Sequence, residues 1–328
     1  FFSEFIKDVL DLKKDFGKSD IFKGKKIVID YSSPNMAKHL HAGHVRSTLI
    51  GEVLSEIYEA TGYTVHRLNY LNDWGGMGAL IEAYSRLKKG NAIPKLDSEN
   101  SVLDFVYQLI RKAEKTADHH NFEKLVEEDR WELYKIIGEF TDHADFTEKY
   151  SNFIEESKER FRELENGESG VFEIWQMMRG WSTKEFDHFY ELLRVKHDYL
   201  IGESFYGKKG ADFVKDKLRT GDVVLFTKEI ADLEIKKAQK EFEAETIKLS
   251  VLEKLLEEIN NDIGAYVIML PSGARFVIMR ADGATIYATR DLTSIKHRVD
   301  TFDPTRLVYE VGEEQSLHFK HIFEAARV

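Results

Sequence analysis

The sequence of 328 residues contains no cysteine, so it has no disulfide framework, and zinc could be held only by histidine or carboxylate side chains. It also contains no long uncharged apolar run of the kind that a membrane-spanning helix requires. Its first residues, FFSEFIKDVLDLKKDF, alternate apolar and charged residues at helical spacing, unlike the continuous apolar core of a signal peptide. We therefore expect a cytoplasmic protein that contacts no membrane.

Further absences exclude or disfavour particular classes of function. The sequence contains no GxxxxGK[ST], which excludes a P-loop, and no GxGxxG follows a predicted strand. A formal net charge of -11 disfavours bulk binding of nucleic acid, because phosphate contacts need lysine and arginine, but it allows a local basic track. Internal repeats and low-complexity linkers are also absent. The 42% of hydrophobic residues suffices for at least one large core, and we expect two lobes.

Near the start, a strand, a loop, a helix and a second strand follow one another. Residues 26–31, KIVIDY, form a β-branched run that predicts a strand, and residues 64–71, TVHRLNYL, alternate as a second strand. Between them, Gly62 indicates the end of a helix. The apolar residues of this helix recur every four positions: Val45, Leu49, Val53 and Ile57. This order is typical of a βαβ unit and predicts a parallel sheet.

The same order returns at the other end of the chain. RLVYEV (306–311) predicts a buried strand, Gly312 a turn, and residues 315–328 a helix that continues to the last residue. Two further strands, AYVIML and ARFVIM, flank Pro271-Ser272-Gly273 and predict a β-hairpin. Residues 80–194 have helical periodicity and no strand signal. A second charged stretch, from Ile230, has nearly heptad-spaced leucines and isoleucines and predicts an inserted helical hairpin or arm. Its leucines are more typical of packing positions than of a partner-binding zipper.

These elements predict an α/β fold in which a Rossmann-like, nucleotide-binding parallel sheet carries large helical insertions. We divide the chain into an N-terminal helix or linker, the first half of the core, a mostly helical insertion, a return to the core, a charged helical insertion and the second half of the core, truncated at its C-terminal end. The corresponding ranges are 1–20, 21–79, 80–200, 201–229, 230–263 and 264–328.

Three histidines, His39, His41 and His44, fall within six positions of the segment SSPNMAKHLHAGHVRS. A metal site is one explanation, but no carboxylate lies nearby, and zinc-binding helices favour histidines at i and i+4. Solvated loop histidines are a second. A nucleotide site explains more, because the start of a helix after a parallel strand offers unpaired N–H groups and a positive dipole end to phosphate. Gly43 would let a flat ring lie against the backbone, and two imidazoles could stabilise charge on an α-phosphate.

This segment resembles the HIGH motif of class I aminoacyl-tRNA synthetases, and specifically that of arginyl-tRNA synthetases. NYLNDWGGMG, EFDHFYELLRVKHDYLIGESFY, DGATIYATRDL and VYEVGEEQSLHF each resemble a further block of that family, in the family's order. Together the blocks cover both halves of the Rossmann core. The two charged helical stretches match poorly, as insertions can.

The resemblance implies ATP-dependent attachment of L-arginine to its tRNA through an arginyl-adenylate. ATP would be a substrate, with Mg²⁺ as its counter-ion, and the protein would hold no metal of its own. The protein would be a monomer, and this domain would bind the acceptor end of an arginine tRNA. The resemblance assigns three residues to catalysis: Lys38, His41 and His44. It assigns six to arginine: Ser33, Asn35, Glu203, Tyr287, Asp291 and Gln315. It assigns six to ATP: His41, Gly43, His44, Gly312, Glu314 and His318.

Chemistry supports an arginine pocket independently, because a guanidinium group is always charged and its planar fork is held best by carboxylates. Tyr287 and Asp291 are four residues apart and would share one face of a helix, where the tyrosine could flank the guanidinium plane. Alternatively, Asp291 pairs with Arg290 or Lys296 on a solvated face. Glu203 could either complete the pocket or cap the turn that follows it.

Three departures from the family pattern affect individual residues. No KMSKS-like loop is present, and Lys38 would take the place of its lysine. Met77 stands where glutamine is common, which questions a substrate hydrogen bond there, and His39 replaces a usual proline and leaves the loop less rigid. Trp74 and Trp175 are more typical of a core or a pocket wall than of base-stacking platforms. Asp118-His119-His120 resembles a motif of metal phosphoesterases, but it falls in a charged helical run, where we expect a solvated face.

The ends of the sequence suggest a piece of a longer protein, because it begins at Phe1 without methionine and ends within a predicted helix. We expect it to lack an N-terminal tRNA-contacting domain, the KMSKS side and an anticodon-binding domain, and to be nearly inactive in tRNA charging by itself. Two alternative functions remain: another HxGH nucleotidyltransferase, or a non-catalytic synthetase-like module that binds nucleotide or tRNA.

Overall fold

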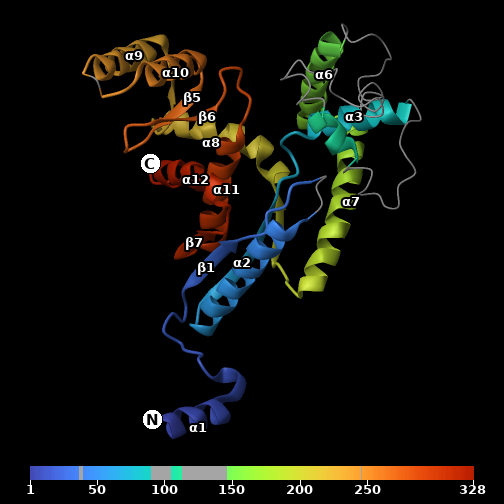
Figure 1. Ribbon diagram of the computed structural model, residues 1–328, viewed down its shortest axis with the longest axis vertical. Helices are drawn as coiled ribbons and strands as arrows, with labels where there is room; N and C mark the ends of the chain where they lie inside the picture. Colours follow the sequence, from blue (N-terminus) through green and yellow to red (C-terminus); the bar gives the residue numbers. More distant parts are fainter. Residues whose placement is uncertain (37–39, 90–104, 113–145, 245) are drawn as a thin grey trace. The chain divides into compact units, whose positions relative to one another are not determined.

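The computed structural model describes the chain in five ranges, residues 1–36, 40–89, 105–112, 146–244 and 246–328. The chain forms two compact units (Figure 1). Unit 1 comprises residues 1–204 and 305–310, and unit 2 comprises residues 205–304 and 311–328.

A parallel four-stranded sheet is the centre of unit 1, with the strand order β3-β2-β1-β7. The strands are β1 (Lys26–Asp30), β2 (Thr64–Leu71), β3 (Tyr199–Gly202) and β7 (Arg306–Tyr309). Ile27 of β1 pairs with Val65 on one side and with Arg306 on the other, so β1 lies inside the sheet and is buried along nearly its whole length. The predicted α/β fold with a Rossmann-like parallel sheet is confirmed.

Helix α2 (Ala42–Ala60) connects β1 to β2 and packs on both strands. It meets the sheet through small residues, because a Cβ atom at Gly51 would overlap the ring of the fully buried Tyr31. The Tyr31 hydroxyl donates to Glu52 Oε2 at 2.6 Å, which fixes the helix over the strand. The predicted helix is thus confirmed, but its apolar stripe does not face the sheet: Leu49 and Ile57 are 41% and 54% exposed.

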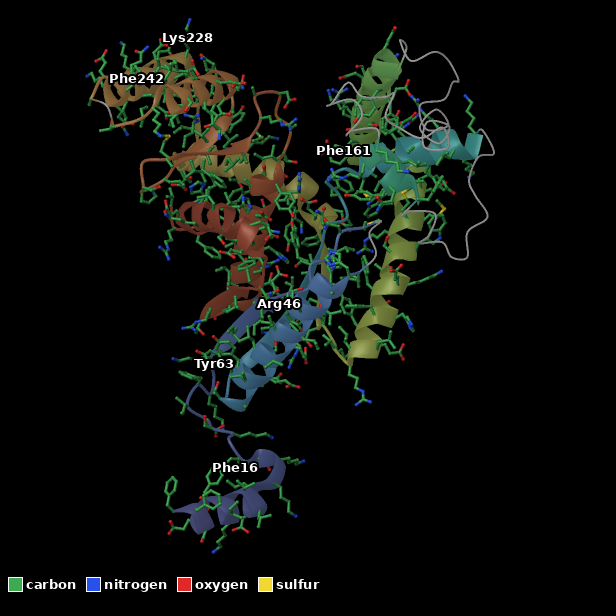
Figure 2. The ribbon with its side chains drawn as sticks, viewed as in Figure 1. Phe16, Arg46, Tyr63, Phe161, Lys228 and Phe242 are labelled. Atoms are coloured by element: carbon green, nitrogen blue, oxygen red, sulfur yellow. The ribbon has the colours of Figure 1, made fainter. Side chains whose placement is uncertain are left out.

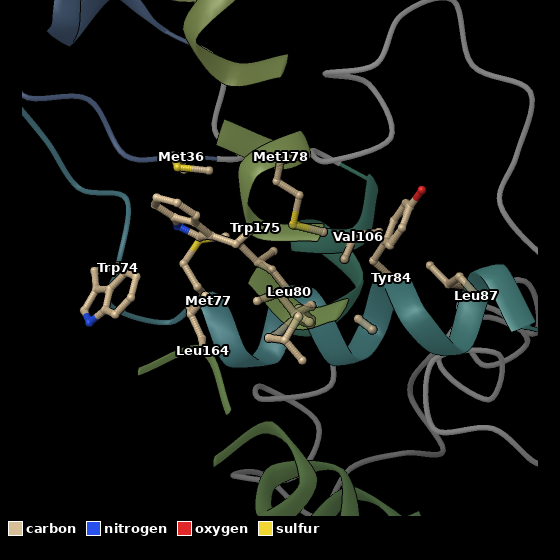
Figure 3. Close-up of a cluster of buried hydrophobic side chains, with 14 of the residues drawn as sticks. Met36, Trp74, Met77, Leu80, Tyr84, Leu87, Val106, Leu164, Trp175 and Met178 are labelled. Atoms are coloured by element: carbon tan, nitrogen blue, oxygen red, sulfur yellow. The ribbon is translucent and has the colours of Figure 1, made fainter. Parts of the chain in front are cut away.

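The described part of unit 1 also contains the helices α1 (Phe2–Leu12), α3 (Met77–Lys89), α6 (Phe146–Asn166) and α7 (Ser169–Leu193). Residues 105–112 are helical as well, and Lys13–Asp15 form a 3-10 helix after α1. A large apolar cluster joins α3, α6 and α7, with Trp74 and Trp175 edge to face at 5.7 Å between ring centroids (Figure 3). Both tryptophans are core residues, as predicted, and Met77 is a buried member of the same cluster. Asp118, His119 and His120 lie outside the described residues.

The described residues of unit 2 form a separate antiparallel sheet, ordered β4-β5-β6, and five α-helices. The strands are β4 (Val224–Leu225), β5 (Tyr266–Met269) and β6 (Arg275–Met279). The helices are α8 (Gly207–Thr220), α9 (Lys228–Glu243), α10 (Leu249–Asn261), α11 (Tyr287–Phe302) and α12 (Ser316–Ala325). The predicted β-hairpin is confirmed as β5 and β6, and α9 and α10 pack together as the predicted helical hairpin (Figure 1). Arg275 joins this helical hairpin to the sheet through Glu234 and Asp262.

The leucines of the helical hairpin only partly follow the prediction. Leu252 and Ile259 are buried packing positions, whereas Leu233 and Leu249 are 67% and 55% exposed. Figure 2 shows Lys228 and Phe242 near the two ends of α9. A strict heptad seam is therefore not formed along these two helices.

Several element ends differ from the sequence prediction. β3 was not predicted, β7 ends at Tyr309, and α12 ends at Ala325, three residues before the last residue. The prediction of a helix through Val328 is wrong at its last residues, because Arg327 N and Val328 N donate to the carbonyls of Glu324 and Ala325, three residues back, so the α-helical pattern gives way to a turn. Within the described ranges, no helix is long and apolar enough to cross a membrane.

Candidate active site

The carboxyl ends of the four parallel strands bring three of the site residues predicted in unit 1, Ser33, Asn35 and Glu203, to one edge together with two acidic residues that were not predicted, Asp73 and Glu310. Ser33 and Asn35 follow β1, Asp73 follows β2, Glu203 follows β3, and Glu310 follows β7. Parallel strands all end at the same edge of their sheet, which is where open α/β sheets bind ligands. The sheet therefore explains why segments far apart in the sequence contribute to one edge.

Helix α2 begins at the two predicted catalytic histidines. His41 is its N-cap, and its Nδ1 accepts a hydrogen bond from Gly43 N at 3.1 Å. The His41 N–H donates to His44 Nδ1 at 3.2 Å, and the two ring centroids are 4.2 Å apart. Because both Nδ1 atoms accept, each neutral ring carries its proton on Nε2. Both imidazoles are thus fixed in the tautomer that donates from the outer nitrogen.

The charge around this helix start favours an anion. No acidic residue lies in the first turn of α2, and the positive end of the helix dipole is there. Figure 2 shows Arg46 at the same end of the helix. The ring that lies over Gly43 belongs to His41, whose Cε1 would be 2.9 Å from a Cβ at that position. Lys38 and His39 lie outside the described residues.

The loop before α2 is held in an unusual backbone conformation. Ser32 and Ser33 both have positive φ values, 75° and 45°, which cost free energy in residues other than glycine. Ser33 donates from its backbone N to Asn69 Oδ1 and from Oγ to Asp30 Oδ1, each at 3.2 Å. Ser32 Oγ shares a 2.7 Å hydrogen bond with the buried Tyr190 hydroxyl. Side chains of β1, β2 and α7 therefore maintain this loop.

Next to this network lies the half-buried His197, whose ring centroid is 4.5 Å from that of Tyr31 and 4.8 Å from that of Tyr190. Its Nε2 has no hydrogen-bond partner among the described residues. Burial, aided by Arg67 and opposed by Asp198, lowers the pKa of His197 to about 4.

We expect this histidine to make the fold sensitive to acid. The unfolded chain binds the proton near the ordinary pKa of 6.5, while the folded chain resists it down to about 4, so stability falls as the pH drops through this window. The loss should be about 3 kcal/mol, and urea unfolding from pH 7 to pH 4 measures it. His197→Gln should remove this contribution to the pH dependence of stability. His188→Gln, at an exposed position, should leave the pH dependence unchanged. An unchanged pH dependence in His197→Gln would contradict the assignment.

Asn35, assigned to arginine by resemblance, pairs with the residue at the end of β2. Its Oδ1 accepts from Asn72 Nδ2 at 2.7 Å, and the two residues also form a parallel bridge. Met36 N and Asn72 N donate to backbone carbonyls across the same junction, each at 3.1 Å. The segment that leads to the histidines is thus an extension of the sheet.

Glu203 is 1% exposed, and its Oε2 accepts a hydrogen bond from Gly75 N at 2.9 Å. Gly75 belongs to the turn after β2, so this carboxylate faces the edge of the sheet. Glu203 also begins a short 3-10 helix, Glu203–Tyr206. A carboxylate this deeply buried needs donors or a cation as partners.

In unit 2, the predicted pair Tyr287 and Asp291 lies on one face of α11, four residues apart. His318 of α12 joins them: it donates from Nε2 to Asp291 Oδ2 at 2.7 Å, and its ring centroid is 5.9 Å from that of Tyr287. The Asp291 side chain is 13% exposed. The alternative partners are engaged elsewhere, because Arg290 donates to Thr285 and Lys296 pairs with Asp300. Asp291 therefore does not pair with a neighbouring cation on a solvated face.

The turn after β7 brings the other predicted residues of unit 2 to the start of α12. Gly312 precedes a 3-10 turn, Glu313–Gln315, and Gln315 is the N-cap residue of α12. The carboxylate of Glu314 folds back over Gly312, so a Cβ at that glycine would overlap it. Glu314 and Gln315 are exposed, which leaves both accessible to a ligand.

Sequence reasoning missed the residues that support the site: Asp30, Asn69, Asp73, Arg179, Tyr190 and Ser204. Only their places at strand ends could have indicated Asp30 and Asp73, and no local pattern marks Arg179 or Tyr190. Within the described ranges, no group of three or more histidine or acidic side chains is arranged to hold a metal ion.

The chain matches the family model described as tRNA synthetases class I (R), catalytic domain, over residues 6–230 and 249–328. It is 32% identical over 325 residues to an arginine–tRNA ligase of Clostridioides difficile (strain 630), with 97% of this chain and 44% of that protein covered. It is 34% identical over 324 residues to arginine–tRNA ligase 2 of Bacillus anthracis, with the same two shares covered. The chain thus spans a little under half the length of these relatives.

Solved structures support the fold. The structure is similar to an arginyl-tRNA synthetase from Plasmodium falciparum, with a TM-score of 0.54 and 21% identity over 96% of this chain and 41% of that one. It is also similar to a putative arginyl-tRNA synthetase from Campylobacter jejuni, with a TM-score of 0.50 and 14% identity over 99% of this chain and 56% of that one.

Proposed function

We propose that this chain, which belongs to the class I (R) tRNA synthetase catalytic-domain family, activates L-arginine with ATP and transfers it to the acceptor end of an arginine tRNA. The arginine carboxylate would attack the α-phosphate of ATP, forming arginyl-adenylate and releasing pyrophosphate. A terminal hydroxyl of the tRNA would then attack the arginyl carbonyl and release AMP. ATP would enter with Mg²⁺ as its counter-ion, and no residue of this chain is assigned to the metal.

The observation that carries this proposal is the environment of Asp291. Its nearly buried carboxylate accepts a hydrogen bond from His318 and is flanked by the 43% exposed ring of Tyr287. A cationic, planar guanidinium group complements a carboxylate next to an aromatic face. Glu203 is proposed as an arginine contact as well and is tested by its own variant.

The start of α2 supports the ATP part of the proposal. His41 and His44 are oriented to donate from Nε2, and developing charge on a phosphate is stabilised best by such preorganised donors. We assign His41, Gly43 and His44 to ATP, together with Gly312, Glu314 and His318. Lys38 is proposed as the cation that replaces a KMSKS lysine, and Ser33, Asn35 and Gln315 as further arginine contacts.

The test is isothermal titration of the chain with L-arginine, L-lysine and L-citrulline. L-Arginine should bind at least tenfold more tightly than the neutral citrulline, because citrulline leaves a buried carboxylate uncompensated. Lysine, whose ammonium cannot form the bidentate fork, should also bind more weakly. Binding of ATP without any preference for arginine would instead favour another HxGH nucleotidyltransferase or a non-catalytic module.

A further inference from the structure

We propose that Asp73 is a positioning residue for the carboxylate of Glu203, and that it thereby sets the affinity for L-arginine. The inference rests on the proposed function, because it takes Glu203 as a contact of that substrate. Among the described residues, the Asp73 carboxylate accepts hydrogen bonds from Ser204 and Arg179, neither of which is assigned to a ligand, so its effect would pass through the turn that carries Glu203.

Two turns bind each other reciprocally at the ends of adjacent strands. Asp73 follows β2 and Glu203 follows β3, and these strands pair in parallel, so their carboxyl ends are neighbours. Asp73 Oδ1 accepts from Ser204 N at 2.8 Å, on the residue after Glu203. In return, Glu203 Oε2 accepts from Gly75 N at 2.9 Å, two residues after Asp73. Each turn therefore supplies the donor for the other turn's carboxylate.

Asp73 fixes the backbone on both sides of Glu203. On one side, Ser204 donates from its backbone and also from Oγ, which lies 2.9 Å from Asp73 Oδ2. On the other side, the Asp73 carboxylate lies so close to Gly202 that a Cβ there would overlap it. The Glu203 side chain is thus attached to a backbone that has little freedom to rotate.

Helix α7 fixes Asp73 in turn. Arg179 donates from Nε to Asp73 Oδ2 at 2.9 Å, and Trp175 donates from Nε1 to the Asp73 carbonyl oxygen at 2.7 Å. The Asp73 side chain is fully buried, so its charge depends on these donors. A helix within the span predicted as an insertion therefore supports the residue proposed to bind arginine.

Asp73→Asn keeps the size of the side chain but replaces one acceptor oxygen by an NH₂ group. That group cannot accept from Ser204 or Arg179, so at least one of these hydrogen bonds is lost. The turn should loosen, and we expect L-arginine to bind about tenfold more weakly, with ATP affinity unchanged. Isothermal titration with L-arginine and with ATP measures both.

A double-variant comparison distinguishes a role of Asp73 in positioning Glu203 from a general loss of protein stability. In the presence of Glu203→Gln, the change Asp73→Asn should add little further loss of arginine affinity, because both act through one carboxylate. Glu82→Gln is the matched control: Glu82 is 3% exposed in the same unit and pairs with Arg86 at 2.6 Å and Arg160 at 2.9 Å. It should lower the thermal stability as Asp73→Asn does but leave arginine affinity unchanged.

The possible outcomes distinguish a failure of the role proposed for Glu203 from a failure of the role proposed for Asp73. If the unaltered chain does not bind L-arginine, or if Glu203→Gln binds it normally, the role proposed for Glu203 fails and the inference fails with it. If Glu203→Gln weakens binding while Asp73→Asn does not, or if the two losses simply add, only the inference is overturned. Should Asp73→Asn not fold, Ser204→Ala removes a single donor and should weaken arginine binding about threefold, but only when Glu203 is present. Unchanged binding in that variant would also overturn the inference.

Discussion

Replacing Asp291 by asparagine is expected to weaken L-arginine binding a few hundredfold or more, while ATP affinity changes little. The Asp291 side chain is only 13% exposed, so its charge would meet the guanidinium group largely away from water. Removing one partner of a buried ion pair costs roughly 3–5 kcal/mol, which corresponds to this loss. Asparagine can still accept from His318 through its carbonyl oxygen, so the packing of α11 against α12 should survive.

Isothermal titration of arginine and ATP against wild type and Asp291→Asn measures this effect. Asp300→Asn is the matched control, because Asp300 lies on the same helix but forms an exposed ion pair with Lys296. Its arginine affinity should equal that of the wild type. An equal loss for both ligands in Asp291→Asn would indicate a folding defect, and normal arginine binding would end the assignment of an arginine site.

Replacing His44 by alanine in the full-length natural protein should slow tRNA arginylation about a hundredfold or more at saturating substrates. The physical reason is the loss of an Nε2–H donor held in place by the bond from His41 N to His44 Nδ1. Preorganised donors at a developing negative charge contribute effects of this size to the rate, and little to binding of the ground state. The rate should therefore fall much more than the affinity for ATP.

A control is needed because His44 also accepts a hydrogen bond at the first turn of α2, and losing such a cap destabilises a helix by about 1 kcal/mol. Ser47→Ala removes the bond from Ser47 Oγ to the His44 carbonyl, 3.2 Å long, in the same turn. This variant should disturb the helix start but retain nearly normal turnover. A His44→Ala enzyme with a near-normal rate would refute the role.

Local patterns in the sequence determined the elements that form this site. The β-branched run before residue 31, the alternation of residues 64–71 and the glycine at 62 predict β1, β2 and the end of α2 because these features act within a few residues. The shared face of Tyr287 and Asp291 follows from the geometry of any helix that contains both. The position of His41 and His44 at a helix start after a parallel strand was predictable for the same reason.

Only the tertiary structure decided which residues meet. Asp291 contacts His318, 27 residues away in the sequence, and Glu203 contacts Gly75, 128 residues away. At such sequence separations, the periodicity of a helix or strand does not predict which residues meet. Helix α2 packs through Gly51 and not through its apolar stripe, because the ring of Tyr31 occupies the space that a side chain would need. Periodicity indicates that a helix exists, but the shape of the surface beneath the helix selects the face that is buried. In the same way, only tertiary contacts from α7 to Asp73 hold the turn that carries the Glu203 carboxylate in place.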